Sequence, residues 1–131
     1  MKTEFFVHKN YVEGILTLKG ETVSWCKVDI QEKTWTVSDW KTLPEYQHKG
    51  YGKQILEFTL TKMAETFPIP DKIEYIWNGQ NQYVYDWLVR HFDAVNQCPL
   101  AVKKYSSADD WESHIYNLNT EKFLNYFLKS A

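Results

Sequence analysis

The chain has 131 residues, of which 44% are hydrophobic, 17% aromatic and 24% charged, which excludes a disordered protein and fits one packed domain. The formal net charge is -2 and the longest basic cluster is Lys103-Lys104, so we expect no nucleic acid and no membrane as partner. The sequence contains neither the roughly 20 apolar residues of a membrane span nor the apolar run of a signal peptide, and we expect a cytoplasmic protein.

Four short β-prone runs fill the first third of the chain. They cover residues 5–7, 14–18, 22–30 and 34–40, and the third alternates residue types in the strand period. Lys19-Gly20-Glu21 predicts a hairpin turn between the second and third runs. This part of the chain therefore predicts an antiparallel meander of strands.

A helix is predicted over residues 51–67, because the apolar side chains there recur three, four and seven positions apart. Pro68 ends this helix. Residues 72–77 predict a fifth strand. The strand at 34–43, the helix and the fifth strand then form a β-α-β unit, in which the two strands are parallel.

The last part of the chain predicts more helices and two short strands. Residues 78–81 predict a turn and helix start, and short strands are expected around 94–97 and 100–105. The helix between them has an apolar stripe of Val84, Trp87, Leu88 and Phe92. Two later stripes predict helices after Tyr105: Trp111, Ile115 and Leu118, then, behind a cap at Thr120, Phe123, Leu124, Phe127 and Leu128.

These elements predict an α+β fold with a mixed, mostly antiparallel central sheet, a β-α-β unit and extra C-terminal helices. We expect a single domain over residues 1–131, with a core over about 1–105 and a C-terminal helical extension over 106–131. Cys26 and Cys98 are too few for a disulfide scaffold or a thiolate metal site. The four histidines lack metal-ligand spacing, so we expect no metal.

The segment Leu43-Pro44-Glu45-Tyr46-Gln47-His48-Lys49-Gly50-Tyr51-Gly52-Lys53 lies between a predicted strand and the first turn of a predicted helix. A glycine-bearing loop at this place presents backbone N–H groups at the positive end of a helix, where an anion such as a pyrophosphate can approach. The Walker phosphate loop does not match, and a Gly-x-Gly-x-x-Gly match would have Ile55 at its third glycine. Another anion-binding fold is therefore needed.

Gln47-His48-Lys49-Gly50-Tyr51-Gly52 resembles the hallmark of the GNAT superfamily of acyl-CoA N-acyltransferases: Gln or Arg, two residues, Gly, one residue, then Gly or Ala. The order of strands and helices resembles that of the family over about residues 22–105. The amino acids themselves match closely at only about a dozen positions. It implies acetyl or acyl transfer from acetyl-CoA to an amine-bearing acceptor. The cofactor-binding residues that it implies are Leu43, Gln47, His48, Lys49, Gly50, Tyr51, Gly52, Lys53 and Asn81.

Acyl transfer to an amine needs a base for the amine and a proton for the leaving thiolate. Asp39, four residues before Leu43, is the candidate base, because the family often uses a carboxylate on its fourth strand. The family's thiolate-protonating tyrosine lies seven residues beyond an asparagine. Counting from Asn78 places Tyr85 there, whereas counting from Asn81 places Leu88 there, and we favour Tyr85.

The family usually inserts two helices between its first and second strands, and this chain has no room for them. The helices after Tyr105 then wall the acceptor pocket, form a homodimer contact or simply cover the sheet. Two other functions stay open from the sequence. One is a non-catalytic acyl-CoA-binding module of the same fold, and the other is a β surface that stacks sugars or bases on exposed tryptophans.

Overall fold

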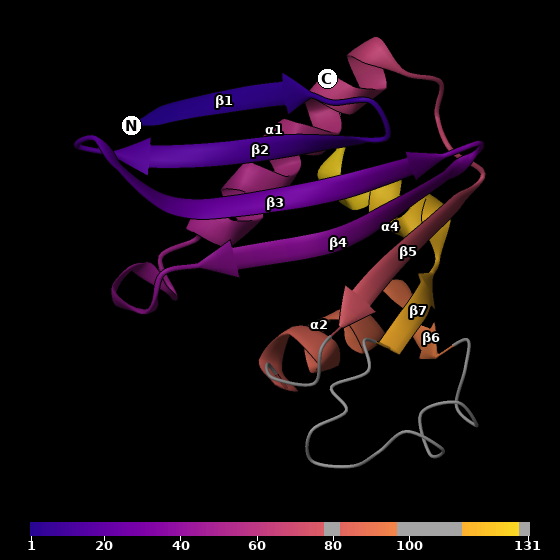
Figure 1. The fold of residues 1–131 in the computed structure, drawn as a ribbon. Coiled ribbons are helices and arrows are strands. Elements are labelled where there is room, and N and C mark those ends of the chain that lie inside the picture. The colour runs from indigo at the N-terminus through magenta and orange to yellow at the C-terminus, as the bar shows by residue number, and fades with distance from the viewer. Residues whose placement is uncertain (78–81, 97–113, 129–131) are drawn as a thin grey trace.

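The computed structural model describes residues 1–77, 82–96 and 114–128 (Figure 1). Its strands are β1 (Lys2–Val7), β2 (Tyr11–Leu18), β3 (Glu21–Gln31), β4 (Thr34–Thr42), β5 (Lys72–Trp77), β6 (Val95–Asn96) and β7 (His114–Leu118). Its helices are η1 (Pro44–Tyr46), α1 (Tyr51–Thr66), α2 (Gln82–Phe92) and α4 (Thr120–Phe127). The strands form one sheet in the order β1-β2-β3-β4-β5-β7-β6.

The predicted α+β architecture is confirmed. The first four strands pair antiparallel, each with the next, as the predicted meander requires. β4 and β5 are parallel and α1 connects them, which confirms the β-α-β unit. α2 and β6 also lie where the sequence places them. The turn expected at 78–81 and the strand expected at 100–105 lie outside the described residues.

The helix predicted from Ile115 and Leu118 is wrong, because His114–Leu118 is strand β7. This strand pairs antiparallel with both β5 and β6. Tyr116 and Leu118 are buried, whereas Ile115 and Asn117 are half-buried, which is the alternation of a strand. Pairing within the sheet has overridden the helical spacing. The segment after residue 105 is therefore not only a helical extension, since β7 belongs to the sheet.

Helix α4 confirms the last predicted helix, with a different cap. Asn119 is the N-cap residue, and its side chain accepts a hydrogen bond from the Lys122 N–H group at 3.0 Å. The hydroxyl of Thr120, the predicted cap, instead accepts from the backbone N–H group of Ile73 at 3.2 Å. Thr120 therefore ties α4 to strand β5.

A glycine lets α1 pack closely on the sheet. Gly14 faces the helix, and a Cβ atom at this position would collide with Thr59 Oγ1. The Cys26 thiol donates to the Thr59 hydroxyl at 3.2 Å, and that hydroxyl donates to the Ile55 carbonyl at 2.7 Å. The largest fully buried side chains of the core are Trp35, Phe92, Phe123, Phe127, Leu16, Ile55, Leu56, Leu60, Met63, Ile73, Leu88 and Val12.

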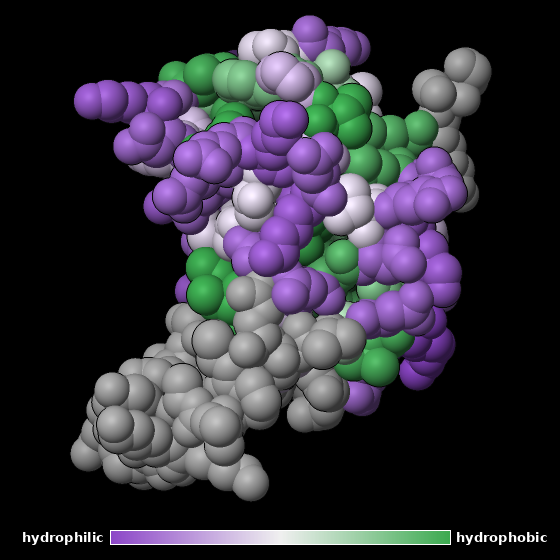
Figure 2. All heavy atoms as spheres, turned by 90° about the vertical axis from the view of Figure 1, so that its right-hand side faces the viewer, coloured by the Kyte–Doolittle hydropathy of each residue, from purple (hydrophilic) through white to green (hydrophobic). Residues whose placement is uncertain are grey.

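In the described part of the chain, α1 and α4 lie behind the sheet of Figure 1, and no helix covers the front of β1–β4. We call this uncovered surface the open face. Half-buried side chains on it include Tyr11, Glu13, Trp25, Lys27, Asp29 and Asp39. Figure 2 shows an adjoining side of the molecule, where hydrophilic and hydrophobic side chains are intermixed and the coloured atoms form no continuous apolar surface.

Candidate functional site

Strands β4 and β5 diverge beside the predicted loop (Figure 1). Their parallel pairing begins at Thr34 and ends at the pair Val37 and Tyr75, although β4 continues to Thr42. The register between β3 and β4 shifts at the same point, which leaves Ser38 as the extra residue of a β-bulge. Beyond the bulge, no strand of the described chain pairs with β4 on its β5 side.

The backbone of β4 beyond the bulge presents polar groups toward this gap. The Leu43 N–H group donates to the Val23 carbonyl at 2.9 Å, and the Lys41 carbonyl accepts from the Ser24 hydroxyl at 3.0 Å. Both residues therefore direct these groups toward β3. Because successive residues of a strand direct their N–H and C=O groups to opposite sides, those of Trp40 and Thr42 point to the diverged side.

The predicted loop folds over the end of β4. Leu43 also accepts from the Tyr46 N–H group at 2.9 Å, so its backbone groups are engaged within the chain. The Gln47 side chain donates to the Thr42 carbonyl at 3.1 Å. His48 has a φ of 63° and Gly50 has a φ of 85°, both in the left-handed region that reverses the chain into α1.

Helix α1 begins at Tyr51 without a capping side chain and with no acidic residue in its first turn. The first N–H groups of an α-helix have no acceptor within the helix, and the helix dipole favours negative charge there. The N–H groups of Tyr51, Gly52 and Lys53 are therefore suited to an anion. This helix end belongs to the loop that the sequence singled out, at the junction of β4 and α1.

Lysine side chains flank the same helix end. Lys53 Nζ lies 4.7 Å from the centroid of the Tyr126 ring of α4, and Lys49 Nζ lies 5.9 Å from that of Tyr46. Tyr46 in turn donates to the Glu21 carboxylate at 3.3 Å. The negative charge of Glu21 raises the pKa of the Tyr46 hydroxyl, which therefore stays protonated.

Trp40 joins β4 to α1, a role that sequence analysis missed. Its indole Nε1 donates to the Gly52 carbonyl at 2.8 Å. A Cβ atom on Gly52 would lie 3.1 Å from Thr42 Oγ1 and 3.5 Å from Trp40 Nε1. The signal was present in the sequence: large apolar residues occur at 35, 37 and 40, so the strand period breaks where the bulge lies.

Asp39, the candidate base, lies directly after the bulge on the open face. It pairs in register with Lys27, and its carboxylate accepts from the Trp25 indole at 3.3 Å. Its charge contributes to raising the pKa of Tyr75, for which burial is the larger cause. Tyr85, the candidate acid, lies in α2, but its side chain is outside the described part of the structure, as is Asn81.

Among the described tryptophans, Trp35 and Trp40 do not belong to the exposed stacking row that an aromatic binding surface requires. Trp35 is 1% exposed and belongs to the core. Trp40 is half-buried, and its ring lies 6.3 Å from Tyr75 and 5.7 Å from Trp87. Trp35 and Trp40 therefore give no support to a β surface that stacks sugars or bases, which is one of the functions that the sequence left open.

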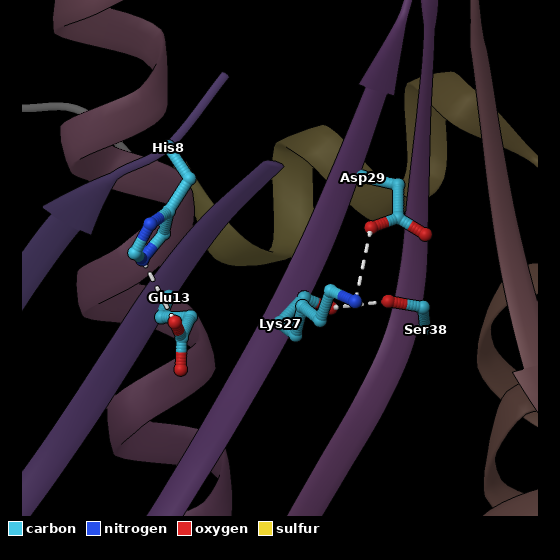
Figure 3. Close-up of polar contacts among 5 residues, drawn as sticks. All are labelled: His8, Glu13, Lys27, Asp29 and Ser38. Atoms are coloured by element: carbon cyan, nitrogen blue, oxygen red, sulfur yellow. Dashed lines mark hydrogen bonds and ion pairs between the residues drawn. The ribbon is translucent and has the colours of Figure 1, made fainter. Parts of the chain in front are cut away.

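The open face carries a polar network near the bulge (Figure 3). Lys27 Nζ lies 3.9 Å from Asp29 and 4.4 Å above the Tyr11 ring. The Ser38 hydroxyl donates to the Lys27 carbonyl at 3.4 Å. Only the short turn between β1 and β2 stands where the family that the sequence resembles inserts two helices, so side chains of the open face border the approach to Asp39.

No protein-family model and no curated protein matches the sequence, but solved structures match the fold. The PaiA N-acetyltransferase from Thermoplasma acidophilum, in complex with coenzyme A, matches with a TM-score of 0.59 at 12% identity, over 82% of this chain and 60% of that chain. A Desulfovibrio desulfuricans protein described as a GNAT-family acetyltransferase matches with a TM-score of 0.62 at 17% identity, over 85% of this chain and 70% of that chain. The Escherichia coli ribosomal-protein-S18-alanine N-acetyltransferase matches with a TM-score of 0.58 at 16% identity, over 86% of this chain and 69% of that chain.

The chain thus has the fold of the GNAT superfamily of acyl-CoA N-acyltransferases. It spans 60% and 65% of the length of the first two solved structures that it matches. None of the described helices is long and apolar enough to cross a membrane. Among residues 1–77, 82–96 and 114–128, no group of three His, Cys, Asp or Glu side chains could hold a metal ion.

Proposed function

We propose that the protein is an N-acetyltransferase that transfers an acetyl group from acetyl-CoA to an amine of a small molecule, peptide or protein. One observation carries the proposal. The uncapped N-terminus of α1 lies beside the backbone edge of β4, where β5 has diverged. The helix end suits a pyrophosphate, and the strand edge suits the amide groups of a pantetheine arm. The likeness of the fold to acetyltransferases supports the same assignment.

The loop residues hold the coenzyme in this proposal. The N–H groups of the first turn of α1 and the charges of Lys49 and Lys53 bind the phosphates. Gly50 and Gly52 keep the approach to the backbone free of side chains. The Gln47 side chain fixes the loop to the end of β4 through the Thr42 carbonyl. Acetyl-CoA supplies the activated acyl group as a co-substrate.

The acceptor amine must lose a proton before or as it attacks the thioester carbon. We assign this proton to the carboxylate of Asp39, directly or through a water molecule. The open face, on which no described helix covers Asp39, gives the amine a route to that carboxylate. The phenol of Tyr85 on α2 is the proton donor that the family resemblance implies for the leaving thiolate.

The proposal is tested by calorimetric titration with acetyl-CoA and with CoA. The titrations use the wild-type protein, Gly52→Arg and Thr61→Arg. A side chain at position 52 points at Thr42 and Trp40 and fills the space between α1 and β4. Thr61 is exposed on the same helix, away from the loop, so Thr61→Arg adds an identical side chain elsewhere.

We expect saturable binding by the wild type and Thr61→Arg, and loss of binding by Gly52→Arg, whose far-ultraviolet circular dichroism should still show the folded protein. No binding by the folded wild type would reject the proposal. Binding without release of CoA in the presence of diverse amines would favour the non-catalytic module.

A further inference from the structure

Tyr75 occupies the apex of the divergence between β4 and β5. It is the last residue of β5 that pairs with β4, and its partner is Val37, directly before the bulge. The Tyr75 ring meets the Trp40 ring edge-on, at 6.3 Å between centroids and 81° between planes. Because Val37 and Trp40 both belong to the helix-covered side, Tyr75 lies on the side of the sheet opposite to Asp39.

The Tyr75 side chain is 7% exposed, and no group in the described part of the chain hydrogen-bonds its hydroxyl. Every fully buried side-chain nitrogen or oxygen atom of the described residues has a partner. The Tyr75 hydroxyl must therefore reach solvent-accessible space. Burial and the Asp39 charge raise its pKa, so the phenol carries its proton at neutral pH.

The lengths of the strand and the coenzyme arm agree with a reaction at this apex. From Val37 to Thr42, β4 extends about 17 Å at about 3.3 Å per residue. The arm between the pyrophosphate and the sulfur has about 13 bonds and extends about 15 Å, at about 3.4 Å per three bonds. The phosphate site at α1 adjoins Trp40 and Thr42. An arm that runs along β4 from this site therefore brings its sulfur close to Val37 and Tyr75.

We propose that the Tyr75 hydroxyl, in place of the Tyr85 phenol that the family resemblance implies, protonates the thiolate that leaves during acyl transfer, while Asp39 acts from the open face. The inference rests on the function proposed above. The amine nitrogen bonds to the carbonyl carbon, the C–S bond breaks, and its electron pair leaves on sulfur. The amine proton passes to Asp39 or water, the phenol proton passes to sulfur, and the phenolate regains a proton from solvent. Base and acid then act from opposite sides of the sheet.

The test measures the pKa of the bound CoA thiol through the ultraviolet absorbance of the thiolate, which needs no acceptor. A hydroxyl that hydrogen-bonds the thiolate favours the charged form and lowers this pKa. The variants are Tyr75→Phe, Tyr85→Phe and Tyr116→Phe. Tyr116 is the matched control, since it is a buried tyrosine that pairs with Tyr75 on the side away from β4. Hydrolysis of acetyl-CoA without acceptor provides a second readout.

We expect Tyr75→Phe to raise the pKa of the bound CoA thiol by about 1. Acetyl-CoA hydrolysis should fall about 100-fold, with the CoA dissociation constant and thermal midpoint unchanged. Tyr116→Phe should change neither readout. An unchanged thiol pKa in Tyr75→Phe, or a rise only in Tyr85→Phe, would overturn the assignment and leave the proposed function intact.

The pKa of the CoA thiol bound to the wild-type protein provides a further test that needs no variant. Its bound CoA thiol should have a lower pKa than free CoA, and a value at or above that of free CoA contradicts the inference. Absence of CoA binding by the wild type would instead reject the proposed function itself.

Discussion

The indole nitrogen of Trp40 donates a 2.8 Å hydrogen bond to the carbonyl oxygen of Gly52. This bond joins the diverged end of β4 to the first turn of α1, so the backbone edge of the strand and the uncapped helix end are held in fixed relation. A ligand that binds to both groups therefore loses less binding free energy in ordering them. Trp40 is thus a positioning residue for the proposed coenzyme site.

Trp40→Phe keeps an aromatic ring and removes the bond to Gly52. Since one hydrogen bond contributes about 1 kcal/mol net, acetyl-CoA affinity should fall about fivefold, as measured by calorimetry. Trp25→Phe is the control, because its indole bonds Asp39 on the open face. Equal losses in both variants would show that the Gly52 bond has no special role.

Gly50→Ala should lower both stability and coenzyme affinity. Gly50 has a φ of 85°, and an alanine in this left-handed conformation costs about 1 kcal/mol of unfolding free energy. Gly20 provides a matched control, since it has a φ of 81°, equally open surroundings and a place in the β2–β3 turn. Urea unfolding should show similar losses for Gly50→Ala and Gly20→Ala, whereas only Gly50→Ala should weaken acetyl-CoA binding. Weakened binding in both would trace the effect to global stability.

The loop and its strand and helix could be predicted because their signals are local. Gly50 and Gly52, directly before an amphipathic helix, determine where that helix begins. The bulge at Ser38 could in principle be predicted from the broken strand period. The separation of β4 from β5 at that point could not, because the pairing of β5 depends on residues far away in the sequence. The same limitation explains the error at β7, where spacing that suits a helix at Ile115 and Leu118 is overridden by pairing with β5.

The roles of single side chains were harder to predict than the elements. The choice of Asp39 as candidate base came from the carboxylate that the family resemblance places on the fourth strand. Tyr75 was not singled out, because its proposed role depends on where β4 and β5 separate. Gly14 likewise gives no sequence signal, since its need for a missing Cβ atom comes from Thr59 on a distant helix. Such contacts arise only when the packing is known.

Gly14→Ala should destabilise the protein by about 2 kcal/mol, because the new methyl group overlaps the Thr59 hydroxyl in a packed core. Thr59→Ala removes that hydroxyl and its bonds to Cys26 and Ile55, at a cost of about 1 kcal/mol. The double variant should therefore lose less free energy of unfolding than the sum of the single variants. Additive losses in urea unfolding would contradict the collision.

Cys26 should be an inert thiol in the folded protein. Burial raises its pKa from 9.0 to about 12, and the Thr59 hydrogen bond offsets only part of this effect. With Cys98→Ser as background, an aromatic disulfide reagent at pH 8 should modify Cys26 only after denaturant is added. Rapid modification of the folded protein would show that the contact between β3 and α1 opens readily.

Because of this raised pKa of Cys26, the free energy of unfolding falls at alkaline pH. Between pH 9 and 12 the unfolded chain loses the Cys26 proton while the folded protein keeps it, so the free energy of unfolding falls as pH rises. From pH 8 to pH 10 this contribution amounts to about 1.4 kcal/mol. The loss should appear as a steeper decline for the wild type than for Cys26→Ala in urea unfolding at both pH values, because the variant keeps every other titrating group. Parallel declines would mean that the folded thiol ionises as readily as the unfolded one.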